Sequence, residues 1–403
     1  MDPTIEDVYR RDWPLIVGAV ARYTSNLALA EDSVQEAFAR ALAFKGPIYN
    51  PDAWITTTAR RIAVDALRRT QVQTRLLPRL AHEAVERNAI EMVSEEAPFA
   101  GDERLLLISL AAQPQLREAD RIAVALRFVC GESTADIARV LLIPEATLAA
   151  RLTRAKKRIA ATGLATSSPA GLLPRIDTIL TTVYLLFTLG HGVAGPVESG
   201  RRASAMALGR DLARLLPSHL ETQGLLALML LTQARQGAAA DDDGGPVGLE
   251  DADRTLWDRD LIAEGMALAA AALPGGGRFA LQAGISGLHD AAVTWEATDW
   301  NAIARLYVRL YAVWPAPAVA LNRAIARGLS PDVGPEAALA ELDGAFPAPS
   351  GPLAGQVWAA RAELLRRIDR TAEAADDYRK ALASALPEGD KRFLQRRLSA
   401  IGG

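Results

Sequence analysis

The segment from Ser133 to Arg158 constrains the fold more than any other part of this 403-residue chain. Ser133 is a favoured N-cap residue, and Asp136 three positions later can close a capping box. Pro144 disfavours helical backbone at the residue before it and suits the start of a second helix. Beyond Pro144, apolar residues recur every three or four positions, at Leu148, Leu152, Ala155 and Ile159. The pattern predicts two helices joined by a tight turn.

The second of these helices carries a row of cations. Its basic residues are Arg151, Arg154, Lys156, Lys157 and Arg158. A short helix that supports a cationic helix is typical of proteins that lay the second helix in a DNA major groove, and an ordinary hairpin with a solvated basic face is the alternative. The positions expected to meet DNA are Glu145, Ala146, Thr147, Ala149, Ala150, Arg151, Thr153, Arg154 and Lys157. Only Arg154 is a strong base reader, so we expect modest specificity that depends partly on DNA shape.

Composition favours a nearly all-helical protein, because Ala and Leu dominate and aromatic residues make up 5%. The length of 403 residues predicts two or three domains. The single cysteine, Cys130, excludes an intrachain disulfide and a multi-cysteine metal site. The four histidines are scattered, and no catalytic constellation is present. We therefore expect no enzyme activity, no cofactor and no metal.

The overall charge does not indicate nucleic-acid binding. Residues 1–170 hold 22 basic and 21 acidic side chains, and the remainder is net acidic. Local clusters of basic residues at 60–69 and 151–158 do indicate nucleic-acid binding. The acidic N-terminus has no signal segment and no apolar run is long enough to span a bilayer, so a cytoplasmic protein is expected.

Residues 1–70 are predicted to form helices with short connections. The helix at 27–42 is amphipathic, with Phe38 on the apolar side and carboxylates on the other, at Glu31, Asp32 and Glu36. A Gly/Pro loop follows, and then a helix that Asp52 is expected to cap. This helix combines Trp54 with arginines, which suits unstacked single-stranded bases, while core packing is the alternative for Trp54.

The rest of the chain divides by composition. Residues 71–101 are an acidic linker with at most a partial helix, 102–161 hold four helices, and 162–171 are a small-residue hinge. From 172 to 403 a repeat with a period close to 35 predicts a tetratricopeptide-like α-solenoid, against the alternative of a non-repetitive bundle. Its clearest copy has Trp358, Ala362, Leu365, Ala374, Tyr378 and Ala381, and others involve Ala338 with Leu342, Ile303 with Tyr307, and Ala205 with Gly209. An acidic loop at 241–260 interrupts the array.

Three segments resemble those of extracytoplasmic-function sigma factors. Residues 29–38 resemble region 2.2, residues 50–69 are similar to regions 2.3 and 2.4, and residues 133–158 resemble region 4.2. They occur in the family's order and spacing. The remainder resembles one subgroup, which appends a tetratricopeptide-like domain.

The resemblance implies an all-α protein with sigma region 2 at 1–70, sigma region 4 at 102–161 and a regulatory domain at 172–403. The residues implied to bind the polymerase clamp are Asp32, Gln35, Glu36 and Phe38. Those implied for the −10 element are Lys45, Tyr49, Asn50, Trp54, Arg60, Arg61, Arg68 and Arg69. The 145–159 helix is implied to read the −35 element.

Three positions depart from the family pattern. Leu142 stands where most of these factors have a turn glycine, so a non-glycine residue is expected in a left-handed conformation there. Ala149 and Ala150 stand where relatives often carry polar readers. Phe187 to His191 departs from the pattern of the subgroup.

The function implied is that of an alternative sigma factor, which binds core RNA polymerase and promoter DNA and initiates transcription. Its C-terminal domain is expected to dock on the promoter-binding half and control it, with the 241–260 loop as a contact and activation as the implied outcome. The rivals are a stand-alone helix-turn-helix regulator and a helical scaffold. Neither explains the acidic helix and the Trp/Arg helix within 27–69.

Overall fold

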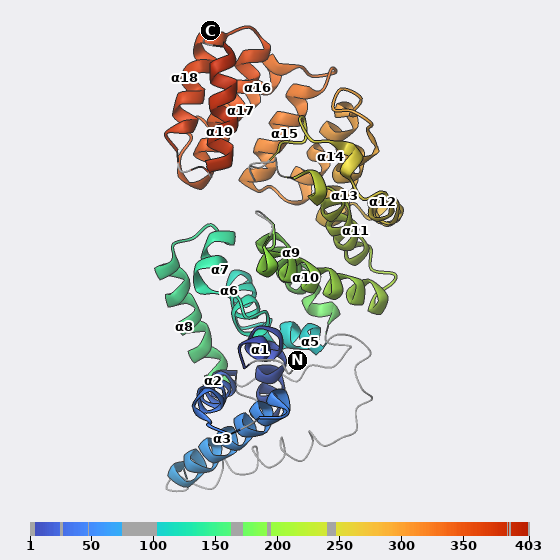
Figure 1. Ribbon diagram of the computed structural model, residues 1–403. Helices are drawn as coiled ribbons and strands as arrows, with labels where there is room; N and C mark the ends of the chain where they lie inside the picture. Colours follow the sequence, from blue (N-terminus) through green and yellow to red (C-terminus); the bar gives the residue numbers. More distant parts are fainter. Residues whose placement is uncertain are drawn as a thin grey trace. The chain divides into compact units, whose positions relative to one another are not determined.

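The computed structural model describes residues 5–24, 27–46, 48–74, 103–162, 172–191, 195–239, 247–384, 386 and 388–401. Within these ranges the regular structure is helical and no strand is present, as the composition predicts (Figure 1). The chain forms two compact units, Met1–Leu189 and Gly190–Gly403. No helix among the described residues has the length and apolar character needed to cross a membrane.

The first unit holds two groups of helices. The first group is α1 (Ile5–Thr24), α2 (Leu27–Ala43) and α3 (Pro51–Thr74). The second group is α5 (Glu103–Ala111), α6 (Glu118–Val124) with a π-helical turn (Ala125–Val129), α7 (Thr134–Val140), α8 (Glu145–Thr162) and α9 (Ile176–Leu189). The expected linker, apart from the end of α3, and the expected hinge after Thr162 lie outside the described residues.

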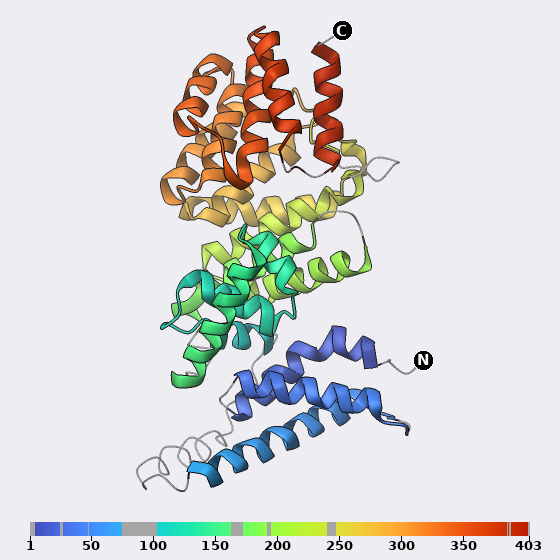
Figure 2. The same ribbon diagram turned by 90° about the vertical axis from the view of Figure 1, so that its left-hand side faces the viewer.

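Helices α1, α2 and α3 pack against one another (Figure 2). Three rings join the first two helices: Phe38 lies 5.1 Å from Tyr9 and 5.7 Å from Trp13, measured between ring centroids. Such ring pairs stabilise a core beyond the area that they bury. The apolar stripe predicted for 27–42 is therefore the inner face of α2.

The two groups touch within the first unit. Helix α1 contacts α5, and α2 contacts α8. A Cβ atom added to Gly18 of α1 would lie 2.1 Å from a methyl carbon of Leu107 in α5. Only glycine allows this approach, since a side chain would overlap Leu107.

Helix α9 packs against α5, α6 and α7, so it belongs to the first unit. Arg175, in the short turn before α9, donates to the carbonyl oxygen of Ser109 at 2.9 Å. The buried apolar side chains of α9 are Ile176, Ile179, Leu180, Val183, Leu186, Phe187 and Leu189. The units therefore divide after residue 189, later than the boundary at 172 that the sequence suggests.

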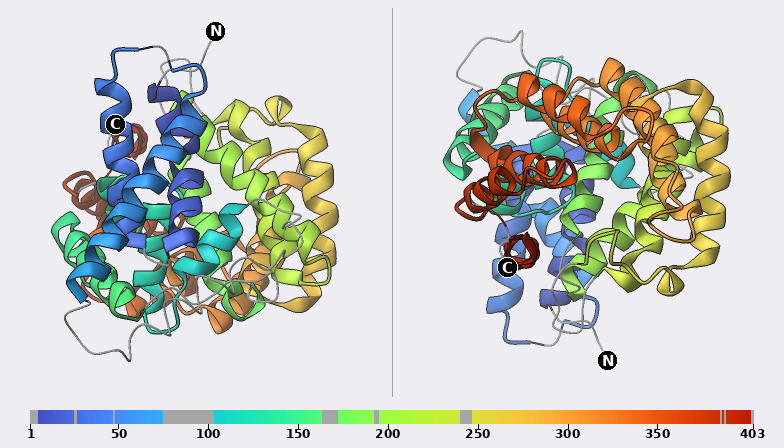
Figure 3. Two further views of the ribbon diagram at one scale, coloured as in Figure 1. Left: turned by 90° about the horizontal axis from the view of Figure 1, so that it is seen from below. Right: turned by 90° about the horizontal axis from the view of Figure 1, so that it is seen from above.

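The second unit is a succession of helices. They are α10 (Pro196–Leu215), α11 (Leu220–Ala234), α12 (Arg259–Ala272), α13 (Arg278–Ala291), α14 (Trp300–Val313), α15 (Pro317–Leu329), α16 (Pro335–Ala345), α17 (Ala354–Arg367), α18 (Thr371–Leu382) and α19 (Glu388–Ile401). Each packs against the next along the chain, and Figure 3 shows them following a curved path. Nearest-neighbour packing of this kind is what a helical repeat array requires.

The repeat positions lie where successive helices meet. Ala362 and Leu365 of α17 are buried against Ala374, Tyr378 and Ala381 of α18. Small residues at these positions let two helices approach closely. The helical array is thus present, and its assignment as a tetratricopeptide domain stays a prediction.

The described part of the acidic loop is held inside the second unit. Glu250 forms an ion pair with Arg397 of α19. Asp253 accepts from the backbone N–H of Thr255, and Asp258 caps α12. Arg254 donates to the carbonyl oxygens of His289 and Ala292, which fixes the end of the loop on α13. Several of the loop's carboxylates and cations therefore serve the unit's own structure.

Candidate nucleic-acid interface

The turn between α7 and α8 has the geometry that the sequence predicts. The Ser133 hydroxyl oxygen accepts from the N–H of Asp136 at 3.0 Å and donates to its carboxylate at 2.9 Å. Leu142 adopts a left-handed conformation with a φ of 54°. Its N–H donates to the carbonyl oxygen of Arg139, and that of Ile143 donates to Ala138. These bonds close the first helix and direct the chain into the second.

Helix α8 has one buried face and one open face. The buried side chains are the predicted ones, Leu148, Leu152, Ala155 and Ile159. They face α6 and α7, against which α8 packs. This support fixes the orientation of the helix while its other face stays open to a ligand.

The nine positions expected to meet DNA lie on the accessible side of α8. Eight are exposed and Arg151 is half-buried; the exposed ones are Glu145, Ala146, Thr147, Ala149, Ala150, Thr153, Arg154 and Lys157. The Thr153 hydroxyl donates to the carbonyl oxygen of Ala149, which leaves its methyl group for apolar contact. Apart from its cations, the row offers few hydrogen-bonding side chains, so the groups suited to phosphate and base contacts are mainly Arg151, Arg154 and Lys157.

Lys156 does not belong to this open row. Its ammonium group forms an ion pair with Glu31 of α2 and lies 4.8 Å from the centroid of the Phe128 ring. The Glu31 side chain is only 6% exposed, although the sequence predicted it on the polar side of its helix. The expectation for Glu31 was wrong because the second group of helices covers this part of α2. The basic row of α8 is thus divided between an internal contact and an exposed surface.

The sequence did contain a signal for the buried carboxylate. Glu31 stands three residues before Val34 and seven before Phe38, so it lies on the apolar stripe of α2. A lone carboxylate on such a stripe indicates a buried partner. Lys156 similarly lies four residues after Leu152 and three before Ile159, at the edge of the buried stripe of α8.

Helix α3 presents its arginines to solvent. Ile55, Ala59 and Ala63 are fully buried. The exposed arginines are Arg60, Arg61, Arg68 and Arg69. They form a basic surface along two turns of a rigid helix, which suits a phosphate backbone.

The loop before α3 places aromatic groups at the end of this basic surface. Tyr49 is 84% exposed, and Lys45 is exposed as well. Trp54 is half-buried, with its ring 5.8 Å from that of Phe44. Trp54 thus packs against Phe44, which is itself 51% exposed, and keeps part of its own ring accessible.

Asn50, rather than Asp52, caps α3. The side-chain oxygen of Asn50 accepts from the N–H of Ala53 at 3.1 Å, and its carbonyl oxygen accepts from Trp54. Asp52 lies in the first turn, where a carboxylate is favourable beside the positive end of the helix dipole. The expected cap was therefore wrong by two residues, because Pro51 occupies the first helical position.

The predicted polymerase-binding residues of α2 separate into two faces. Asp32, Gln35 and Glu36 are exposed, and Glu36 accepts from Arg40 at 2.9 Å. Phe38 is only 5% exposed and lies among the rings of the core. The structure thus places Phe38 where it supports α2, and leaves the three polar residues as an open surface.

Helix α8, which is buried along one face and follows the tight turn after α7, defines a helix-turn-helix protein. A second basic helix, α3, belongs to the other helical group of the first unit. Comparison with known families agrees with this class. Residues 8–72 match the model of sigma-70 region 2, residues 110–159 match sigma-70 region 4, and residues 175–273 match a family of unknown function, DUF6596. The chain belongs to the sigma-70 family of RNA polymerase sigma factors, whose regions 2 and 4 recognise promoters.

The match to a relative extends over nearly the whole chain. An uncharacterised protein of Rhizobium meliloti (strain 1021) is 36% identical over 404 residues, covering 96% of this chain and 93% of that protein. No solved structure matches. The segment that matches the family of unknown function begins at residue 175, so it includes α9 of the first unit together with the first helices of the second.

Proposed function

We propose that this protein is an alternative sigma factor that binds core RNA polymerase and initiates transcription at promoters carrying −35 and −10 elements. The observation that carries the proposal is the two-faced α8, buried along Leu148 to Ile159 and open along Glu145 to Lys157. In this proposal the open face lies in the major groove of the −35 element. Lys157 contacts phosphate and Arg154 contacts a base edge.

The −10 element binds along α3 and the loop before it. Arg60, Arg61, Arg68 and Arg69 hold the backbone of the opened strand. Tyr49, which is largely exposed, and the accessible edge of Trp54 offer aromatic surface to an unstacked base. Extruding a base costs a few kcal/mol, which contacts with the polymerase have to offset.

Core polymerase binds the open face of α2. Asp32 and Glu36 lie one turn apart, so their carboxylates share a face of the helix. In this proposal the two carboxylates meet basic groups on the polymerase, and such charge complementarity sets the rate of encounter and the register of binding.

The second unit regulates initiation in this proposal. It is joined to the promoter-binding helices in one chain, and the resemblance to the subgroup with an appended domain favours a requirement for activity. The described part of the acidic loop is engaged by Arg397 and by helix capping. Asp241, Asp242 and Asp243 of the same loop lie outside the described residues, so the loop stays a proposed contact together with other surfaces of the unit.

The test is reconstituted transcription with purified core polymerase, with the transcripts sequenced to identify the promoters. The double variant Asp32→Lys with Glu36→Lys is expected to lose co-purification with core enzyme while its circular dichroism spectrum is unchanged. The matched control is Glu118→Lys with Glu336→Lys, which changes the charge equally at exposed positions elsewhere. Wild-type core binding by the first variant would contradict the assignment of α2. Tight duplex binding without polymerase would favour a stand-alone regulator.

A further inference from the structure

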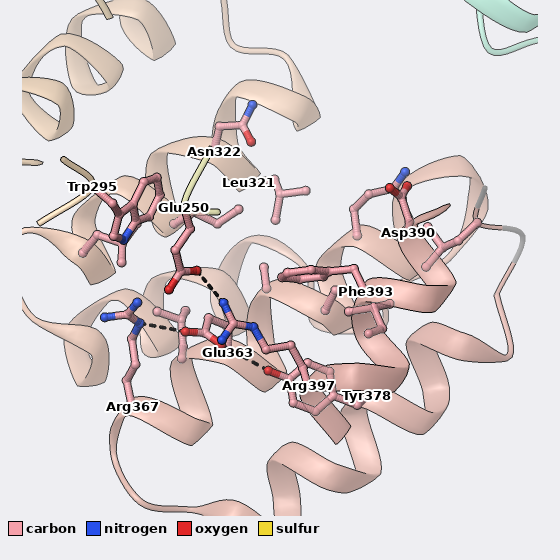
Figure 4. A pocket seen from close by; sticks show the side chains of 18 residues that line it. Glu250, Trp295, Leu321, Asn322, Glu363, Arg367, Tyr378, Asp390, Phe393 and Arg397 are labelled. Carbon is pink, nitrogen blue, oxygen red and sulfur yellow. Dashed lines mark hydrogen bonds and ion pairs between the residues drawn. The ribbon is translucent and has the colours of Figure 1, made fainter. Parts of the chain in front are cut away.

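A cavity of about 410 Å³ lies in the second unit between α15, α17, α18 and α19 (Figure 4). Its walls are mainly apolar and include Leu321, Ile325, Leu364, Phe393 and Leu394. A few charged groups line it as well. This size, and an apolar wall with a small number of polar groups, are typical of sites for small organic ligands.

Helix α19 gives this cavity two chemically different ends. Asp390, Phe393, Leu394 and Arg397 all line it, at spacings of three, four and seven residues that place them on one face of the helix. Figure 4 shows Asp390, Phe393 and Arg397 in a row. Seven residues of helix span about 10 Å, which corresponds to an unbranched chain of about eight carbons. The face therefore matches a ligand with an apolar body and one anionic end.

Arg397 is the cation at the end of this row. Its guanidinium group lies 5.1 Å from the centroid of the Phe393 ring and pairs with the carboxylate of Glu250, 147 residues away in sequence. The Nε of Arg397 is buried and has no hydrogen-bond acceptor among the described residues. The guanidinium group thus holds one carboxylate of the chain itself and retains capacity for another acceptor.

The carboxylate of Glu363, which also lines the cavity, does not act as the acceptor for the Nε of Arg397, because it already accepts from other donors. Glu363 accepts from Arg366, from Arg367 and from the hydroxyl of Tyr378. Its pKa lies below the usual range because these donors outweigh the effect of burial. Arg367 is in turn occupied by Glu363. Arg397 is therefore the cation in this cavity whose partner, Glu250, comes from a remote loop.

We propose that the cavity binds a small monocarboxylic acid with an apolar body of about eight carbons. The ligand carboxylate binds Arg397 in place of Glu250, and the apolar chain lies along Phe393 and Leu394 toward Asp390. Glu250 is an internal competitor that occupies the anion position when no ligand is present. The inference stands on the second unit alone and is independent of promoter binding.

Asp390 provides selectivity at the far end. Partial burial raises the pKa of its carboxyl group. A second carboxylate on the ligand would meet this group and be repelled at neutral pH. The site therefore favours a monocarboxylate over a dicarboxylate of the same length.

Isothermal titration calorimetry of the full-length protein with octanoate, octan-1-ol and octanedioate tests the proposal. Octanoate is expected to bind saturably and at least tenfold more tightly than the other two. Arg397→Gln should weaken octanoate binding at least tenfold, whereas Arg396→Gln, an exposed neighbour on α19, should not change it. Glu250→Gln should strengthen binding at least threefold because the competing carboxylate is gone. Asp390→Asn should bring octanedioate close to octanoate.

The gain expected for Glu250→Gln cannot arise from misfolding, so it keeps the test decisive if Arg397→Gln is unstable. Absence of saturable octanoate binding to the wild-type protein would overturn the proposal. Binding that Arg397→Gln leaves intact, or that Glu250→Gln weakens, would overturn it as well.

Discussion

Lys156 of α8 forms an ion pair with Glu31 of α2, which connects the helix that we propose to bind the −35 element to the helix that we propose to bind the polymerase. The −35 and −10 elements of a promoter are, by their positions, about 25 base pairs apart, which is about 85 Å at about 3.4 Å per base pair. A compact chain of 189 residues has a radius of gyration of about 16 Å. One sigma factor thus cannot hold both elements while this contact persists, and we expect it to open on the promoter.

Removing the ammonium group is therefore expected to have two opposite effects. Lys156→Met leaves Glu31 buried without a partner and should destabilise the first unit by about 1–3 kcal/mol. It should also raise affinity for promoter DNA in the presence of core polymerase, since the closed arrangement is weakened. Urea unfolding and filter binding measure the two quantities. The double variant with Glu31→Gln should recover part of the stability. Reduced promoter affinity at unchanged stability would show instead that Lys156 contacts DNA.

The exposed face of α8 offers a matched pair of variants. Arg154→Ala is expected to cost about 1–3 kcal/mol and to relax preference at one position of the −35 element. Lys157→Ala should weaken binding to all sequences alike and reduce the salt dependence, as loss of a phosphate contact does. Binding to a randomised promoter library at two salt concentrations distinguishes them. A uniform effect of Arg154→Ala across the library would remove its base-reading role.

The position of α9 determines where the chain can be cut. A chain ending at Ser168 lacks seven buried apolar side chains of α9, each of which contributes about 1.5–3 kcal/mol on burial. That loss is comparable to the 5–15 kcal/mol that stabilises a typical domain. Residues 1–168 should therefore lose cooperative unfolding, whereas residues 1–189 should melt cooperatively by circular dichroism.

The folded truncation after Leu189 then tests regulation. We expect it to lose transcription from the target promoter, because the resemblance favours a second unit that activates. Increased transcription would indicate inhibition by that unit. Unchanged output would end the regulatory proposal.

His289 and Asp290 of α13 are expected to oppose each other in the pH dependence of stability. Burial raises the pKa of Asp290 to about 6, despite Arg235, Arg254 and Arg259 nearby. Burial, with Arg235 and Arg254, lowers the pKa of His289 to about 4. From pH 4 to 6 the folded state binds the extra proton at Asp290, so that residue makes stability fall as pH rises. At His289 the unfolded state binds the extra proton, so stability rises with pH over the same range.

Single substitutions should separate these two contributions. Asp290→Asn should leave a stability that rises more steeply with pH between 4 and 6.5 than in the wild type. In the His289→Asn variant, the free energy of unfolding should fall with rising pH between 4 and 6, relative to that of the wild type. Each difference should reach about 3 kcal/mol by urea unfolding. Parallel pH profiles for all three proteins would contradict the burial of both groups.

Local patterns in the sequence predicted much of the helix-turn-helix. The stripe from Leu148 to Ile159 and the cap at Ser133 are confirmed, because both depend on residues within one or two turns. The left-handed conformation of Leu142 was expected from the family resemblance, because Leu142 stands where most of these factors have a turn glycine. These features need no knowledge of what the helices pack against.

Features that depend on distant partners were predictable only in part, because the helix periodicity places Glu31 and Lys156 on or beside apolar stripes but does not identify their partners. The inward position of Lys156 and the burial of Glu31 result from contact between helices more than a hundred residues apart. Phe38 was placed on the polymerase surface, although its own periodicity put it on the apolar stripe with Val34. Glu250 of the acidic loop pairs with Arg397 of its own unit, while Asp241, Asp242 and Asp243 of that loop lie outside the described residues, so the expected contact of the loop with the basic helices stays a prediction. Charge alone does not identify which of several cations a carboxylate meets.

Helix α9 completes the core around α5, α6 and α7, yet it falls in the segment 175–273 that matches a family of unknown function. The segment that the family match defines therefore does not coincide with the segment that folds as one unit. A gene fusion that delivered residues 175–273 as a block would have delivered part of the promoter-binding half with it. Exchange of the C-terminal half between two such proteins is therefore expected to fail at a junction near residue 170 and to succeed at one just after Leu189. Packing thus makes α9 part of the region 4 fold, although the family match groups it with the helices that follow.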